Sequence, residues 1–102
     1  MSAWIDVAKV GEIILGQCKK INYENFDIAV FNIDNEYYAI ENVCSHDGSP
    51  IVGEPLQGDK IICPRHGAKF CVKTGTVLAP PAYENLLVFP VRIEDGMIQV
   101  LI

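Results

Sequence analysis

Two short stretches of this sequence decide its fold and its chemistry: Cys44-Ser45-His46 and, after sixteen further residues, Cys63-Pro64-Arg65-His66. Each stretch holds one cysteine and one histidine, and the chain has no other histidine. Glycine and proline flank both stretches, as expected where a backbone wraps closely around a metal. Two sulfur and two nitrogen ligands suit either one tetrahedral Zn²⁺ or a [2Fe–2S] cluster with both cysteines on one iron and both histidines on the other. The candidate ligands are Cys44, His46, Cys63 and His66.

The order of the ligands in the sequence helps to choose between a zinc site and an iron–sulfur cluster. A zinc finger usually pairs like with like, two nearby cysteines being followed by two nearby histidines. Here each stretch instead pairs a cysteine with a histidine. A catalytic zinc would also need a nearby general base, and Asp47 is the only carboxylate beside a ligand. The pattern therefore favours the cluster, with a zinc-stabilised interaction module as the weaker alternative.

Composition and charge limit the partners. The chain has 102 residues, 50% hydrophobic and 21% charged, which is ordinary for one soluble globular domain over residues 1–102. A net charge of −5 disfavours nucleic acid and anionic membranes and suits a basic patch on a partner protein. The apolar runs are too short to span a membrane, and the N-terminus lacks the pattern of a secretory signal. We therefore expect a cytoplasmic protein whose cysteines bind metal rather than form disulfides.

Short runs of apolar, β-branched and aromatic residues between turn residues predict strands throughout the chain. No stretch keeps a helical period beyond two turns, so we expect an all-β fold, a small antiparallel sandwich or barrel. Both ligand stretches follow expected strands that present them on the same side. In the first half of the chain we expect a strand, a turn at Gly11 and the start of a second strand within 4–15, a short strand or loop at 16–22, and a hairpin of 26–33 and 36–40. A loop at 43–58 follows, and then strands at 59–62, 67–72 and 77–78. The chain is expected to end with a stiff extended connector at 79–82 and a hairpin of 87–93 and 97–101.

The two-stretch motif resembles that of the Rieske [2Fe–2S] proteins. The sequence HGAKFCVKTG at residues 66–75, the later Pro80-Pro81 segment and the closing hairpin extend the resemblance over essentially the whole chain. It is nearest to the small Rieske-type ferredoxins of bacterial aromatic-ring-hydroxylating dioxygenase systems. The resemblance implies a Rieske-type β-sandwich or barrel with two cluster-binding loops and one [2Fe–2S] cluster per chain.

The resemblance also assigns the ligands. It implies that Cys44 and Cys63 bind the inner iron, that His46 and His66 bind the outer iron near the surface, and that the Pro80-Pro81 segment covers the cluster as a third loop. Two neutral imidazoles in place of two thiolates raise the reduction potential into a range of about −150 to +300 mV.

Four positions differ from the respiratory Rieske subunits. Those proteins carry a disulfide between the two loops, but Ser49 and Arg65 stand at the matching positions here. They also place a serine and a tyrosine hydroxyl near the cluster sulfurs, where this chain has Ala68 and Phe70. Fewer hydrogen bonds to sulfur leave more electron density there, so we expect a potential near the lower end of the range, about −150 mV.

The resemblance implies an electron carrier rather than an enzyme. Such a protein works as a monomer, accepting one electron from a flavin-containing, NAD(P)H-dependent reductase and passing it to a terminal ring-hydroxylating oxygenase. The alternative is the small Rieske-like subunit of an NADH-dependent nitrite reductase, although many such subunits lack the ligands that this chain has. Cys18 and Cys71 fit neither loop pattern, and we expect both to be structural thiols.

Overall fold

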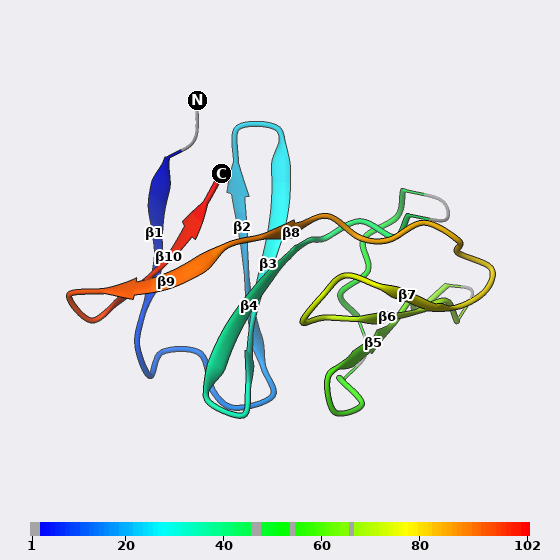
Figure 1. The fold of residues 1–102 in the computed structure, drawn as a ribbon, viewed down its shortest axis with the longest axis horizontal. Helices are drawn as coiled ribbons and strands as arrows, with labels where there is room; N and C mark the ends of the chain where they lie inside the picture. Colours follow the sequence, from blue (N-terminus) through cyan, green and yellow to red (C-terminus); the bar gives the residue numbers. More distant parts are fainter. Residues whose placement is uncertain (1–2, 46–47, 54, 66) are drawn as a thin grey trace.

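The computed structural model describes residues 3–45, 48–53, 55–65 and 67–102 (Figure 1). These residues form three antiparallel sheets with the strand orders β1-β10-β9, β2-β3-β4-β8 and β5-β6-β7, so the all-β expectation is confirmed. Within the described ranges, no helix is long and apolar enough to cross a membrane. The strands are β1 (Trp4–Lys9), β2 (Cys18–Tyr23), β3 (Phe26–Ile33), β4 (Glu36–Glu41), β5 (Lys60–Ile62), β6 (Lys69–Cys71), β7 (Val77–Ala79), β8 (Val88–Phe89), β9 (Val91–Glu94) and β10 (Met97–Leu101).

The first two sheets pack on each other around an aliphatic core, here called the sandwich core. Its side chains alternate along the strands that supply them; on β10, for instance, Ile98 and Val100 are fully buried while their neighbours are only partly so. The two sheets therefore form the expected sandwich, at the left and centre of Figure 1. The buried members are Val7, Ala8, Ile13, Ile28, Val30, Ala39, Ile98 and Val100.

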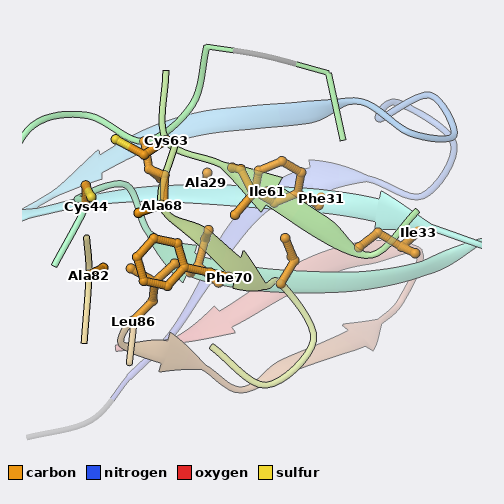
Figure 2. Close-up of a cluster of buried hydrophobic side chains, with 13 residues drawn as sticks. Ala29, Phe31, Ile33, Cys44, Ile61, Cys63, Ala68, Phe70, Ala82 and Leu86 are labelled. Carbon is orange, nitrogen blue, oxygen red and sulfur yellow. The ribbon is translucent and has the colours of Figure 1, made fainter. Parts of the chain in front are cut away.

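A second core lies between β3 and the small β5-β6-β7 sheet, and because it contains two cysteines it is here called the thiol core (Figure 2). Strand β3 serves both cores. Ile28 and Val30 point into the sandwich core, and Ala29, Phe31 and Ile33 point into the thiol core. Burial on both faces explains why β3 is an almost continuous apolar run.

The hairpin of β3 and β4 matches the prediction, with Asp34-Asn35 as its turn. The closing hairpin is also confirmed: Glu94 pairs with Met97, and Asp95 and Gly96 both have positive φ, as a tight type I′ turn requires. Both hairpins were predictable because turn and strand signals lie within a few residues of each other.

Residues 10–17 correct one expectation. A second strand does not begin before Gly16. The segment forms turns instead, and the strand β2 starts only at Cys18. The buried Asn32 holds these turns, since its side-chain Nδ2 donates to the Ile13 carbonyl over 2.9 Å and its backbone carbonyl accepts from the Gly16 N–H.

Two further expectations are wrong at prolines. The single strand expected at residues 87–93 is divided by Pro90, so that β8 pairs with β4 while β9 pairs with β10 in a different sheet. Proline has no N–H for the ladder, which is why it stands where the chain leaves one sheet for the other. The expected extended connector at 79–82 is likewise wrong: Ala79 ends β7, and Pro80-Pro81 forms a turn with a cis peptide bond.

Candidate metal centre

Cys44 begins a tight hairpin three residues after β4. Its N–H donates to the Ser49 carbonyl over 2.7 Å, and its carbonyl accepts from the Gly48 N–H over 2.8 Å. Gly48 has a φ of 77°, in the left-handed region that glycine adopts without strain. Two backbone hydrogen bonds thus join Cys44 to Gly48 and Ser49, which follow the predicted ligand His46 in the sequence.

Cys63 begins a second hairpin of the same pattern, directly after β5. Its N–H donates to the Ala68 carbonyl over 2.7 Å, and its carbonyl accepts from the Gly67 N–H over 3.0 Å. Gly67 has a φ of 78°. In both hairpins the glycine is the fourth residue after the cysteine and the closing carbonyl is the fifth. The two halves of the sequence motif are therefore presented by equivalent backbone turns.

The two cysteine side chains lie together in the thiol core. Their relative exposures are 0% for Cys44 and 1% for Cys63, and neither forms a disulfide. Figure 2 shows both cysteines at the same end of the core. The expectation that strands present both stretches on one side is confirmed for the cysteines. His46, Asp47 and His66 lie outside the described residues, and the assignment of all four ligands stays a prediction.

The surroundings of the two thiols are apolar. Ala68 and Phe70 are completely buried in the same core as the two cysteines, and neither side chain carries a hydroxyl. Ala82 and Leu86 close the core from a later part of the chain. The structure therefore places both positions that we linked to a low reduction potential in the same buried core as the two cysteines.

Asn42 braces the first hairpin, a role that the sequence analysis missed. Its side-chain Oδ1 accepts from the N–H groups of Ile51 and Val52, each over 2.9 Å, so the chain beyond the hairpin is folded back against the end of β4. The next residue, Gly53, lies so close to the second hairpin that a Cβ there would be 3.0 Å from Pro64 Cγ. No local signal marks Asn42, because its partners become neighbours only once the loop has folded back.

Cys71 begins a third hairpin of the same pattern, since its N–H donates to the Thr76 carbonyl and its carbonyl accepts from the Gly75 N–H. Burial raises the pKa of this thiol, but hydrogen bonds from the Thr74 hydroxyl and from the N–H groups of Thr74 and Lys73 outweigh it, and the pKa lies below its ordinary value. The turn residues thus favour the charged form of this thiol.

Cys18 differs from the three hairpin cysteines. It lies on β2, half-buried against the thiol core, and burial raises the pKa of its thiol while nearby Lys20 lowers it to a lesser degree. A protonated, packed thiol agrees with the structural role expected for Cys18.

Comparisons with known proteins agree with this geometry. A family model described as the Rieske [2Fe–2S] domain matches residues 3–90. The biphenyl dioxygenase ferredoxin subunit of Pseudomonas sp. (strain KKS102) is 40% identical over 86 residues, which cover 83% of this chain and 79% of the relative. The 3-phenylpropionate/cinnamic acid dioxygenase ferredoxin subunit of Photorhabdus laumondii is 36% identical over 97 residues, covering 94% and 91%.

Solved structures show the same fold. One is a complex of reduced oxygenase and oxidized ferredoxin in carbazole 1,9a-dioxygenase, which matches with a TM-score of 0.89 and 31% identity over 95% of this chain and 91% of that one. Another is the ferredoxin of Sphingomonas yanoikuyae B1, with a TM-score of 0.87 and 28% identity over 96% and 97%. Two buried thiols on matching hairpins agree with the cysteine half of the ligand set that a Rieske centre needs. The chain belongs to the Rieske [2Fe–2S] domain family, and its cofactor is a [2Fe–2S] cluster.

Proposed function

We propose that this protein is the ferredoxin of an aromatic-ring-hydroxylating dioxygenase system. It accepts one electron from a flavin-containing, NAD(P)H-dependent reductase and delivers it to a terminal oxygenase, and it carries out no reaction on the aromatic substrate itself. The observation that carries the proposal is the pair of equivalent hairpins that bring the buried Cys44 and Cys63 to one end of the thiol core. The ferredoxin relatives described above support the choice of system.

Cys44 and Cys63 would hold one iron and His46 and His66 the other, as the sequence motif implies. When bound, the cluster supplies a one-electron couple whose oxidised form is neutral and whose reduced form carries one negative charge. The protein's own contribution is to exclude water with the apolar side chains of the thiol core and to present the site at the end of the molecule, where a partner can approach it.

The partner side of the proposal rests on charge and on a structural relative. In carbazole 1,9a-dioxygenase a ferredoxin of the same fold forms a complex with its oxygenase. The net charge of −5 on this chain suits a basic docking face on such a partner. We propose that the chain acts as a cytoplasmic monomer formed by a single domain over residues 1–102. The dioxygenase ferredoxins among its relatives support this role over that of a nitrite reductase subunit.

The metal is tested first, on the purified protein. We expect a red-brown colour and, after reduction, an electron paramagnetic resonance signal of low average g. The midpoint potential is expected near about −150 mV and should fall as the pH rises through the alkaline range, because the added charge favours protonated imidazoles. Colourless protein with one zinc per chain would refute the cluster.

Electron transfer is tested next by reconstitution. The protein is mixed with NADH and with the reductase and oxygenase of a biphenyl dioxygenase system, and we measure reduction of the oxygenase and hydroxylation of biphenyl. Both should depend on the protein and should be absent with a Cys63→Ser variant. Reduction of the protein by the reductase without any transfer to the oxygenase, in this and in related systems, would contradict the proposed role.

A further inference from the structure

Residues 80–86 run across the end of the molecule at which the two ligand hairpins lie (Figure 1). Two of its side chains are buried in the thiol core, Ala82 (5% exposed) and Leu86 (6%), while the residues between them are exposed, Tyr83 at 85%. In Figure 2, Ala82 and Leu86 lie at the same end of the core as Cys44. The segment therefore lies against the same end of the thiol core as Cys44.

The two ends of this segment are held by hydrogen bonds to the β6–β7 hairpin. Before the segment, Ala79 pairs with Lys69. At its far end, Asn85 Oδ1 accepts from the Val77 N–H over 2.9 Å, and the Leu86 N–H donates to the Gly75 carbonyl over 2.8 Å.

Ser45 provides a further contact to this segment. Its Oγ donates to the Glu84 carbonyl over 2.6 Å, joining residues 39 positions apart. Ser45 lies between Cys44 and the predicted ligand His46, so its hydrogen bond ties the first ligand hairpin directly to this segment. We propose that Ser45 is a positioning residue of the electron-transfer site, whose hydroxyl holds residues 80–85 closed over the cluster and limits the access of water. The proposal rests on the cluster position proposed above.

The size of the effect follows from the strength of one hydrogen bond. Loss of a bond with a net contribution of about 1 kcal/mol raises the population of an opened segment about fivefold. Water that enters stabilises the charged, reduced cluster more than the neutral, oxidised one, so opening should shift the midpoint potential upward. Access of chelators to the iron should rise with the same population.

The experiment compares Ser45→Ala with Ser45→Thr, both as cluster-containing protein. We expect Ser45→Ala to increase amide hydrogen exchange in peptides covering residues 80–87 about fivefold, to accelerate bleaching of the cluster by a chelator, and to raise the midpoint potential. Ser45→Thr keeps the hydroxyl and should restore all three. Tyr38→Phe is the matched control: it removes a similar exposed hydrogen bond, from the Tyr38 hydroxyl to Glu36 over 2.7 Å, and should change none of them.

Several results would overturn the proposal. They are an unchanged exchange rate in Ser45→Ala, an equal increase in β2–β4, no rescue by threonine, or a Ser45→Ala protein that folds without a cluster or does not fold. Asn85→Ala gives an independent measurement, because it releases the same segment from the β6–β7 hairpin. If this variant increased hydrogen exchange in the segment without raising the midpoint potential, the role assigned to the segment would also be refuted. If the protein proved to hold zinc, the proposed function would fail, while hydrogen exchange would still test the contact between Ser45 and Glu84.

Discussion

The sandwich core and the thiol core are built in different ways. In the sandwich core every buried side chain except Ile13 comes from a strand, and its strands β1, β3, β4 and β10 are five to eight residues long. In the thiol core more than half of the buried side chains lie outside strands, and β5, β6 and β7 have three residues each. The first core is made by sheet ladders, and the second is made largely by loops.

This difference indicates what stabilises each region. A ladder satisfies the backbone hydrogen bonds of its strands as it forms, so the sandwich core needs little else than apolar burial. The loops of the thiol core depend on particular tertiary contacts, such as the Asn42 brace and the bond from Ser45 to Glu84. Metal binding adds to folding stability wherever the ligands are held by loops that are otherwise weakly fixed. We therefore expect the cluster to stabilise the thiol core much more than the sandwich core.

The largest effect is expected from Cys63→Ser. Serine is a poor ligand for iron in this position, so the variant should lose the cluster completely, seen as loss of visible absorption and of bound iron. If the two cores are as independent as their construction indicates, amide protection in β3 and β10 should persist in this variant while protection in β5–β7 falls.

Cys71→Ser is the control for that change, because Cys71 stands at the head of a hairpin with the same hydrogen bonds but is not a predicted ligand. This variant should keep the full absorption of the cluster. If both variants lost the cluster equally, the loss would be due to disruption of a hairpin and not to removal of a ligand. Retention of the cluster by Cys63→Ser would contradict the assigned ligand set.

Ile98→Ala tests the other core. Ile98 is completely buried, and removing its side chain should lower the free energy of unfolding by about 2–5 kcal/mol. Its cross-strand partner on β9, Ile93, is 55% exposed, so Ile93→Ala should change stability by no more than about 0.5 kcal/mol. Chemical denaturation measures both. The absorption spectrum of the cluster should be unchanged in Ile98→Ala, and an altered spectrum would show that the two cores are coupled.

The contrast between local and long-range contacts also separates the features that could be predicted from the sequence from those that could not. The hairpins around Asp34-Asn35 and Asp95-Gly96 depend on residues close together in the sequence, and the structure confirms them. Cys44 and Cys63 belong to a specific motif, and the structure places both in the thiol core. In the sandwich, strand alternation is a local signal that directly reflects burial.

The features that the sequence analysis missed depend on residues far apart in the chain. The division of the last expected long strand at Pro90 follows from β4 and β10 both requiring a neighbour, which no window of sequence around Pro90 contains. The turns of residues 10–17 depend on Asn32, and the contact of Ser45 depends on Glu84. Each of these partners is chosen by the tertiary fold and not by local propensity.

Gly75→Ala should have a smaller effect, confined to the thiol core. A Cβ at Gly75 would lie 2.5 Å from the Leu86 carbonyl oxygen, so the β6–β7 hairpin would have to move away from residues 86–88. Gly96→Ala is the matched control in the sandwich, because Gly96 has nearly the same φ, 78° against 76°, but open space around it. Both variants bear the strain of positive φ, and Gly75→Ala should be less stable than Gly96→Ala by a further amount of about 1–3 kcal/mol. Equal losses of stability would show that no close packing exists there.

The smallest effect is expected from the ion pair of Glu12 with Lys19, at the edge of the sandwich. A hydrogen bond from Lys19 Nζ, 2.8 Å from Glu12 Oε2, and a second from the Lys9 N–H hold the pKa of Glu12 below its ordinary value of 4.5. Because the folded-state pKa is the lower one, the pair stabilises the fold above the unfolded-state pKa, and this contribution disappears as the pH falls through the folded-state value. The stability difference between the protein and a Glu12→Gln variant should therefore be constant at neutral pH, shrink below pH 4.5, and weaken with salt, since both side chains are exposed. Because Glu12 lies on the sandwich side, the absorption of the cluster should not change as Glu12 titrates. If the absorption and the stability difference changed together with pH, the two cores would not be independent.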